Sequence, residues 1–223
     1  AEGTAKERTF FTGSPMAEVL RANLKKIEKS GVLAALGLEK KKYFLLSAHR
    51  EENIDTEENF FSLMNAVNAM AETYGMPIVY STHPRSAKFI EKRRFKFHPL
   101  VRSLKPFGFS DYNNLQMNAF CCVSDSGTLP EESAFYHSIG KDIAAVCIRT
   151  STERPEALDK GAFVLAGISA EQVLQAVDLA VSMLKNGDLC ENVPVYTEDV
   201  SNKVVKLIQS YTGVVNKMVW RKF

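Results

Sequence analysis

Short, wholly apolar runs alternate with amphipathic segments along most of this chain. The run "KYFLLSA" (42–48) has no polar alternation, which is typical of a strand covered on both faces, and "PIVYST", "AFCCVSD" and "IAAVCI" repeat the pattern further on. Between these runs, residues 55–74 and 169–185 carry apolar side chains at helical spacing, and Gly75 is placed to end the first of the two helices. This alternation predicts an α/β fold with a doubly wound, mostly parallel sheet.

Further elements are expected towards the two ends of the chain. The segment "TFFTG" (9–13) reads as a short strand, followed by a helix that Ser14 caps with Pro15 in its first turn. The last helix is expected from Val200 to about Tyr211. No internal repeat interrupts the pattern, so a single large α/β domain of ordinary size is the simplest interpretation.

Composition excludes several functional classes. The 223 residues carry a formal net charge of only +2, too mild to indicate nucleic acid, and the basic stretch "EKRRFKFH" fits the solvated face and end of a helix. No segment approaches the ~18 apolar residues that a membrane helix needs, and the amino end has no apolar stretch typical of a signal peptide. The four cysteines, at 121, 122, 147 and 190, form no C-x-x-C pair, so reduced, buried thiols in a cytoplasmic protein are expected.

Polar clusters follow four of the predicted strands directly. They read "SAHREEN", "STHPRS", "SDSGTLPEES" and "RTSTERPE", and together they bring histidine, arginine, hydroxyl and carboxylate groups. Because ligands of open parallel sheets bind beyond the carboxyl ends of the strands, these clusters predict a site at that edge. Their chemistry fits an anionic, hydroxyl-rich ligand.

Two interpretations are open for "SDSGTLPEE". Thr128 and Glu131 have the spacing of a capping box with Pro130 in the first turn, so the stretch could be simply a well-capped helix. Alternatively, Ser126 and Gly127 lead into a helix start whose backbone N–H groups suit a phosphate. In that case Glu132 is left to accept hydrogen bonds from sugar hydroxyls.

The other clusters are also open to two interpretations. Arg149 and Arg154 suit bidentate binding of phosphate, but surface ion pairs with Glu153 or Glu156 would use the same residues. His49 follows an apolar strand and could be an acid, a base or a structural residue. His83 has the same placement on the next strand, yet neither loop supplies a second ligand at metal spacing, so a metal ranks below phosphate binding. Neither a dinucleotide fingerprint nor a P-loop is present.

Six motifs, in their order along the chain, resemble those of the non-hydrolysing UDP-N-acetylglucosamine 2-epimerases. They run from about Phe10 to the end and read "TGSPM", "SAHREEN", "STHPRS", "LKPFGFSDY", "SDSGTLPEES" and "RTSTERPEALDKG". "HREEN" in place of the usual "HRREN", with Glu51 replacing an arginine, is most similar to the capsule and O-antigen branch. That branch converts UDP-2-acetamido-2,6-dideoxy-L-talose into UDP-N-acetyl-L-fucosamine. The resemblance implies elimination and re-addition of UDP with no cofactor and no metal.

The resemblance also implies roles for individual residues. His49 matches the histidine near the diphosphate and the reacting sugar. Residues that match UDP contacts are Phe107 at the uracil, Glu132 at the ribose, and Ser126, Gly127 and Arg154 at the diphosphate. A second group, Arg50, Glu52 and His83, matches contacts to an activating second UDP-sugar. Thr128 replaces a glycine and Thr150 an acidic residue of the family pattern.

The resemblance further implies a two-domain fold of the GT-B type, of which this chain matches the carboxyl-terminal half. The expected division is 1–14 as a hinge from a missing amino-terminal domain, 15–199 as a Rossmann-like UDP-binding domain, and 200–223 as a helix that packs back on the missing domain. The full-length enzyme is expected to be a homodimer, and the chain alone is expected to be inactive. UDP-N-acetylglucosamine as the substrate, a GT-B glycosyltransferase donor domain and a nucleotide-sugar binding module remain alternatives.

Overall fold

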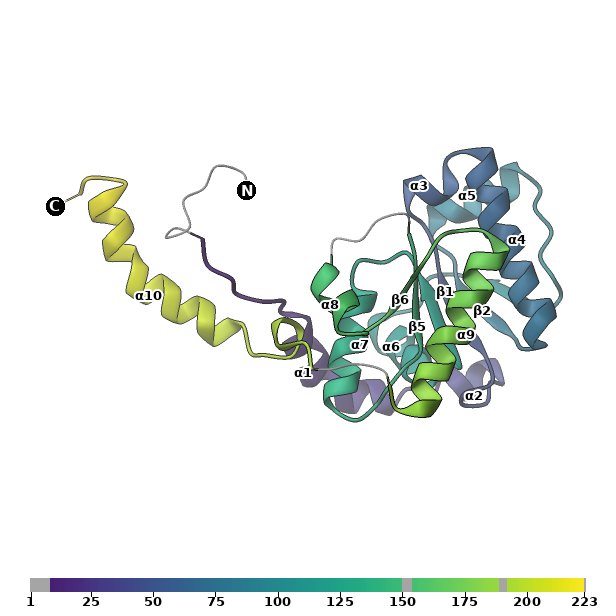
Figure 1. Ribbon diagram of the computed structural model, residues 1–223, viewed down its shortest axis with the longest axis horizontal. Helices are drawn as coiled ribbons and strands as arrows, with labels where there is room; N and C mark the ends of the chain where they lie inside the picture. Colours follow the sequence, from purple (N-terminus) through teal and green to yellow (C-terminus); the bar gives the residue numbers. More distant parts are fainter. Residues whose placement is uncertain (1–8, 150–153, 189–191, 223) are drawn as a thin grey trace.

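A six-stranded, wholly parallel sheet forms the centre of the molecule (Figure 1). The structure is a computed structural model, and it describes residues 9–149, 154–188 and 192–222. The strands are β1 (Phe44–Ser47), β2 (Ile78–Ser81), β3 (Val101–Leu104), β4 (Cys121–Ser124), β5 (Ala145–Ile148) and β6 (Val164–Ala166). Their order in the sheet is β3-β2-β1-β4-β5-β6, the doubly wound order of Rossmann folds, so the predicted fold class is confirmed.

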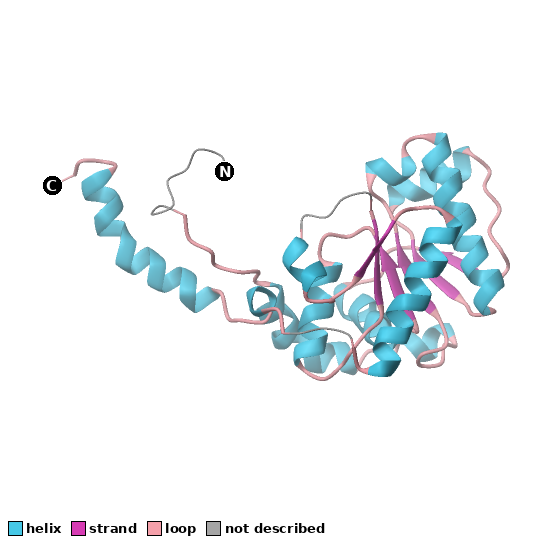
Figure 2. Cartoon of the chain, viewed as in Figure 1, coloured by secondary structure: helices cyan, strands magenta, loops and turns pink. Residues whose placement is uncertain are grey.

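Helices cover both faces of the sheet (Figure 2). One layer contains α3 (Glu51–Ile54), α4 (Glu57–Tyr74), α5 (Pro84–Lys92) and α9 (Ala170–Asn186). The other contains α1 (Met16–Glu28), α2 (Val32–Leu36), α6 (Phe109–Asn118), α7 (Leu129–Ser138), α8 (Pro155–Asp159) and the 3-10 turn η2 (Pro194–Tyr196). A last helix, α10 (Ser201–Met218), lies outside both layers.

The apolar runs became strands because most of their side chains are buried in one of the two layers. In β1, Phe44 and Leu46 pack with α4 and α9, whereas Tyr43 and Leu45 pack on the α1 and α7 side. The adjacent Cys121 and Cys122 likewise point to opposite layers, and both are buried free thiols as predicted. Cys190 lies outside the described residues.

Two helix starts differ from the sequence prediction. The long helix that was expected to begin at Asp55 begins two residues later, at Glu57, because a separate short helix, α3, ends at Ile54 and Thr56 caps α4 by accepting the Asn59 backbone N–H at 3.2 Å. The first helix begins one residue later than expected, with Pro15 at its N-cap position and the Ser14 hydroxyl accepting the Met16 N–H at 3.2 Å.

Residues 9–13 form no strand, so that prediction was wrong. They run beside α10 instead, and the Phe10 ring contacts the Tyr211 ring at 4.8 Å in an edge-to-face arrangement. The apolar pattern of this segment therefore reflects contact with a helix.

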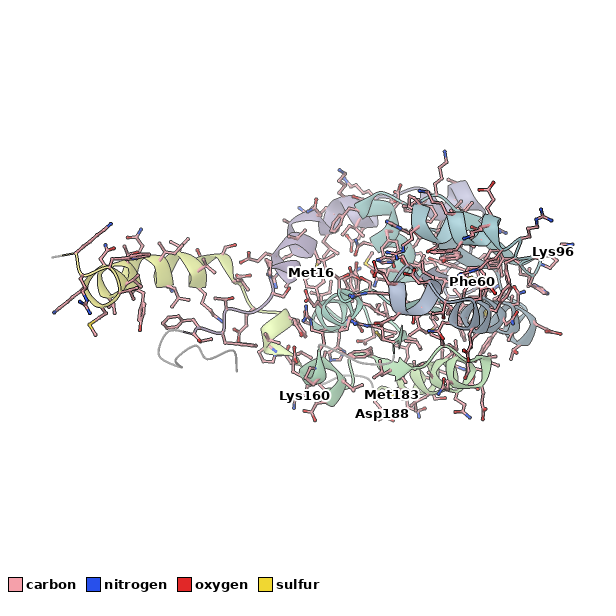
Figure 3. All side chains as sticks on the ribbon, turned by 90° about the horizontal axis from the view of Figure 1, so that it is seen from above. Met16, Phe60, Lys96, Lys160, Met183 and Asp188 are labelled. Carbon is pink, nitrogen blue, oxygen red and sulfur yellow. The ribbon has the colours of Figure 1, made fainter. Side chains whose placement is uncertain are left out.

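The carboxyl-terminal helix projects away from the sheet, as Figures 1 and 3 show. It extends to Met218, well beyond the predicted end near Tyr211, and none of its residues is buried. Its start is held by Glu18 of α1, whose carboxylate accepts the backbone N–H groups of Val200 and Ser201 at 2.8 and 2.9 Å. In the part of the chain that the structure describes, no helix is long and apolar enough to cross a membrane.

Candidate functional site

The loops that follow β1 and β4 leave the sheet side by side. The two strands pair in parallel from Phe44 opposite Cys121 to Ser47 opposite Ser124, and the strand order turns in opposite directions on either side of them. In doubly wound sheets this topological switch point is where ligands bind. "SAHREEN" and "SDSGT" are therefore brought together here, as the sequence predicted.

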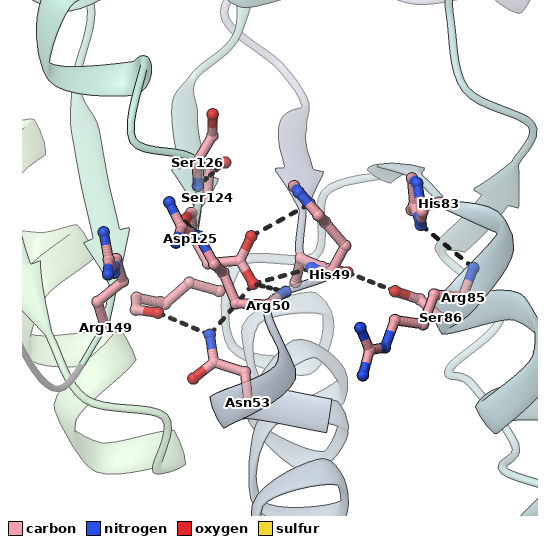
Figure 4. A network of polar contacts seen from close by, with 12 residues as sticks. His49, Arg50, Asn53, His83, Arg85, Ser86, Ser124, Asp125, Ser126 and Arg149 are labelled. Carbon is pink, nitrogen blue, oxygen red and sulfur yellow. Dashed lines mark hydrogen bonds and ion pairs between the residues drawn. The ribbon is translucent and has the colours of Figure 1, made fainter. Parts of the chain in front are cut away.

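Asp125 is the buried centre of this region (Figure 4). One carboxylate oxygen accepts the backbone N–H groups of His49 and Arg50, each at 2.8 Å, and the side-chain amide of Asn53 at 3.2 Å. The Arg50 Nε donates to the Asp125 carbonyl at 3.2 Å. Because a buried carboxylate is costly unless it is hydrogen-bonded, these contacts fix the turn after β1 to the end of β4.

The two strand-end histidines face each other across neighbouring strands. Their ring centroids are 5.2 Å apart, and the His49 side chain keeps 39% of its surface exposed. The Nδ1 atom of His49 lies 3.3 Å from the second carboxylate oxygen of Asp125. The Nδ1 atom of His83 instead accepts the Arg85 backbone N–H at 3.2 Å and so caps α5.

Ser126 and Gly127 lead into the first turn of α7, a ten-residue helix. The Ser126 N–H donates to the Ser124 hydroxyl at 3.0 Å, which shapes the turn. A Cβ atom at Gly127 would lie 3.3 Å from the Nη2 atom of Arg50, so the absence of a side chain allows this close approach. An arginine and a helix N-terminus thus converge on the same turn, an arrangement that suits an anion.

The expected capping box at this helix is wrong. Thr128 makes no side-chain cap bond, and the Glu131 carboxylate is 6% exposed and used elsewhere. It accepts a short hydrogen bond from the Ser14 hydroxyl and two from Arg154, at 3.2 Å from Nε and 2.9 Å from Nη2. Ser14 and Arg154, both distant in sequence, are therefore the partners of Glu131 in place of Thr128.

Arg154 lines an open cavity of 450 Å³ together with Ser14, Glu131, Glu156 and Tyr196. Burial opposes its charge, but the neighbouring Tyr196, Glu131 and Glu156 hold the pKa of its guanidinium above the ordinary value. Arg154 pairs with Glu131, a partner that the sequence interpretation did not name, and Glu156 also acts on its charge. Glu153 lies outside the described residues.

Glu132 is buried more deeply than its predicted role suggested. Only 7% of the residue is exposed, and its carboxylate accepts a hydrogen bond from Gln116 of α6 at 2.7 Å. Burial raises the pKa of this carboxyl group, although hydrogen bonds from Gln116 and Thr128 act in the opposite direction. Its contact with ligand hydroxyls stays a prediction.

The two glutamates of "HREEN" pair with arginines on different sides of the site. Glu52 contacts the Nε atom of the buried Arg149 at 3.3 Å. Glu51 turns the other way and pairs with Arg85 at 2.5 Å, and Arg85 also contacts Asp55 at 2.7 Å. Asp55 is therefore an ion-pair partner and not the cap of the next helix.

Phe107 lies between β3 and α6, half-buried against the core on the α1 and α7 side. Its place in a uracil pocket stays a prediction. Among the described residues, no group of three histidine, cysteine or acidic side chains is arranged to hold a metal ion.

Sequence reasoning missed Asp125 and Asn53 and gave Glu131 only a local role. A usable signal for Asp125 was present, because it is the first acidic residue after a wholly apolar strand. Asn53 carried no comparable signal, since its partners are the Asp125 carboxylate and the Ile148 carbonyl on two distant strands.

Known proteins resemble this chain over most of its length. Residues 1–209 match the UDP-N-acetylglucosamine 2-epimerase family. A Methanococcus maripaludis UDP-N-acetylglucosamine 2-epimerase is 30% identical over 83% of this chain and 50% of its own length, and the Methanocaldococcus jannaschii enzyme is 28% identical with 83% and 51% covered. The chain thus spans about half the length of these relatives.

Solved structures agree with the sequence matches. The UDP-N-acetylglucosamine 2-epimerase from Rickettsia bellii superposes with a TM-score of 0.80 at 35% identity, covering 99% of this chain and 58% of that one. The M. jannaschii enzyme in complex with UDP-GlcNAc and UDP superposes with a TM-score of 0.79 at 27% identity, covering 94% and 57%. By the extent of the family match and by the fold, this chain belongs to the UDP-N-acetylglucosamine 2-epimerase family.

Proposed function

We propose that this chain binds the UDP moiety of a UDP-N-acetyl sugar at the switch point of its sheet and serves as the UDP-binding part of a UDP-sugar C2 epimerase. The observation that carries the proposal is the convergence of the His49–Arg50 turn on the Ser126–Gly127 turn at the start of α7. A diphosphate placed there would meet a guanidinium, an imidazole and a helix N-terminus together.

Within this proposal, Ser126, Gly127 and Arg154 contact the diphosphate, and Phe107 lines the uracil pocket. Glu132 accepts hydrogen bonds from the ribose, which requires its carboxylate to turn out of its buried contact with Gln116. His49 faces the reacting sugar. Arg50, Glu52 and His83 are assigned to a second UDP-sugar, although Arg50 and Glu52 are already engaged by Asp125 and Arg149.

The sugar we propose is UDP-2-acetamido-2,6-dideoxy-L-talose, converted into UDP-N-acetyl-L-fucosamine for capsule or O-antigen synthesis in the cytoplasm. Support comes from "HREEN", in which Glu51 replaces an arginine of the family pattern and pairs with Arg85. The alternative is UDP-N-acetylglucosamine, the sugar of several relatives' names. Relatives differ in substrate, since a Pseudomonas aeruginosa UDP-2,3-diacetamido-2,3-dideoxy-D-glucuronate 2-epimerase is 28% identical over 60% of this chain.

We also propose that α10 packs against a second domain, which supplies the catalytic carboxylates and without which the chain does not turn over. The helix has no buried residue and exposes Val205, Ile208, Met218 and, just beyond its end, Trp220. Apolar side chains gathered along one helix favour a covering partner.

Calorimetry with UDP tests the binding site. We expect Arg154→Ala to weaken UDP binding by about 10- to 150-fold, since a charge-assisted hydrogen bond contributes ~1.5–3 kcal/mol. Glu131→Gln should strengthen UDP binding, because it releases Arg154 from its carboxylate. Arg21→Ala is the matched control, since this exposed arginine pairs with Asp199 and does not line the cavity that contains Arg154.

Equal affinity of wild type and Arg154→Ala would refute the assigned diphosphate contact, and failure of the wild-type chain to bind UDP would refute the proposed function. The sugar is tested on the full-length enzyme with both UDP-sugars. Incorporation of solvent deuterium at C2 of only one of them identifies the substrate.

A further inference from the structure

The four histidines of the chain fall into two classes according to what their Nδ1 atom contacts. His83 and His98 accept backbone N–H groups there, from Arg85 and Leu100, each at 3.2 Å. An accepting nitrogen carries no proton, so the proton of each of these two rings is assigned to Nε2.

The other two histidines meet a carboxylate at Nδ1. His137 lies 2.5 Å from Asp142, and His49 lies 3.3 Å from the Oδ1 atom of Asp125. An ionised carboxylate is an acceptor only, so it favours a proton on the facing nitrogen.

The Asp125 carboxylate is unusual among these partners because it is fully buried. Its Oδ2 atom takes the two backbone N–H groups and the Asn53 amide, whereas Oδ1 accepts no hydrogen bond from a described residue. A buried acceptor without a donor is costly, and the His49 Nδ1 is placed to supply one after a small ring rotation. The carbonyl of Ala48, which precedes the ring, is fixed by hydrogen bonds from Tyr80 at 2.8 Å and Ser86 at 2.7 Å.

We infer that Asp125 is a positioning residue that holds His49 with its proton on Nδ1 and its Nε2 edge turned to the ligand, while His83 beside it uses its Nδ1 to cap α5. The part of this inference that concerns the ligand rests on the proposed function, whereas the part that concerns the position of the proton on the His49 ring does not. With Nδ1–H on Asp125, a protonated His49 presents Nε2–H as a charged donor to an anionic oxygen such as that of a diphosphate. The Nδ1 atom of His83 is already engaged as the cap of α5.

The charged and titratable groups around this pair come from several elements and enter any titration. They are His83 and Tyr80 at the end of β2, Arg50 and Glu52 on the turn and α3, Arg85 on α5, and Cys147 and Arg149 at the end of β5. Of these, Arg85 is paired with Glu51 and Asp55, and Arg149 with Glu52. Asp125 is the carboxylate that directly faces the His49 ring.

The test is ¹⁵N–¹H NMR spectroscopy of the imidazole rings in the chain without ligand. Wild type should show His49 and His137 protonated at Nδ1, and His83 and His98 protonated at Nε2. Asp125→Asn keeps an acceptor oxygen for the two backbone N–H groups and turns its NH₂ group towards the His49 Nδ1, so the proton of His49 should move to Nε2. Asp142→Asn is the matched control, which should change the His137 resonances and leave the His49 proton on Nδ1.

An Nε2-protonated neutral His49 in the wild-type spectrum would overturn the inference, even if Asp125→Asn fails to fold. So would a His49 ring that stays protonated at Nδ1 in a folded Asp125→Asn variant. Addition of UDP separates the two proposals: an Nδ1-protonated His49 whose resonances do not respond to UDP would refute the proposed function and leave the positioning role standing.

Discussion

Asn53 joins three loops of the site, and its truncation should therefore be costly. The side chain is fully buried, and its Nδ2 donates to Asp125 at 3.2 Å and to the Ile148 carbonyl at 2.9 Å. Only the NH₂ group of the amide can satisfy two acceptors, so the orientation of the side chain follows from its partners. Asn53→Ala removes a hydrogen bond to a charged group, ~1.5–3 kcal/mol, and one to a carbonyl, ~0.5–1.5 kcal/mol.

Part of this loss is offset. The Oδ1 atom of Asn53 is buried and has no hydrogen-bond partner among the described residues, so its removal relieves ~1–3 kcal/mol. The net expectation is a decrease of roughly 1–1.5 kcal/mol in the free energy of unfolding. Urea denaturation with an unchanged m-value measures it.

Asn68→Ala is the matched control for this experiment. Asn68 also makes two hydrogen bonds, to the Lys96 carbonyl at 3.1 Å and from the His98 N–H at 2.8 Å, but it is only half-buried. Water can replace its contacts, so we expect a loss below about 1 kcal/mol. If Asn53→Ala is no more destabilising than Asn68→Ala, the anchoring role of Asn53 is wrong.

Two further predictions concern stability. Burial raises the folded-state pKa of Glu132, so the native state binds an extra proton between the unfolded and folded pKa values. Stability therefore falls as pH rises through that window, by ~1.4 kcal/mol for each pH unit between the two values. Glu132→Gln should be more stable than wild type at neutral pH and show a flatter stability profile in urea titrations from about pH 4 to 8, whereas a steeper profile would contradict the argument. An alanine at position 13 would combine a φ of +92° with a Cβ atom 2.9 Å from the Val195 carbonyl oxygen, whereas an alanine at position 140 would have only a φ of +68° in open space. Thermal unfolding should therefore show that Gly140→Ala lowers the free energy of unfolding by about 1 kcal/mol and that Gly13→Ala lowers it clearly more.

The sheet could be predicted because burial on both faces leaves a direct mark on the sequence. The apolar runs contain β1, β2, β4 and β5, and every side chain of the last three is buried. The same rule failed at residues 9–13, where the Phe11 side chain is 77% exposed and Phe10 contacts α10. An apolar pattern indicates that a segment has a partner without specifying which one.

The position of the candidate site could be predicted from the sequence, but its contacts could not. Strand ends share an edge, so "SAHREEN" and "SDSGT" were expected to meet there. The partners of Glu131 were not accessible to this reasoning, because Ser14 lies 117 positions away and Arg154 lies 23 positions away. A capping box is a rule about three neighbouring residues, and it fails when a buried carboxylate finds stronger long-range donors.

The carboxylates of the site differ in what an anionic ligand could displace. Asp125 accepts the backbone N–H groups of His49 and Arg50, so its displacement would dismantle the turn after β1. Glu131 and Glu52 instead hold the side chains of Arg154 and Arg149, which can exchange a carboxylate for a phosphate with little loss of hydrogen bonding. A diphosphate that recruits Arg154 must nevertheless leave Glu131 buried with the Ser14 hydroxyl as its donor. Because this cost is subtracted from the gain at the phosphate, we expect the chain on its own to bind UDP weakly, and the Glu131→Gln variant to bind it more tightly than wild type.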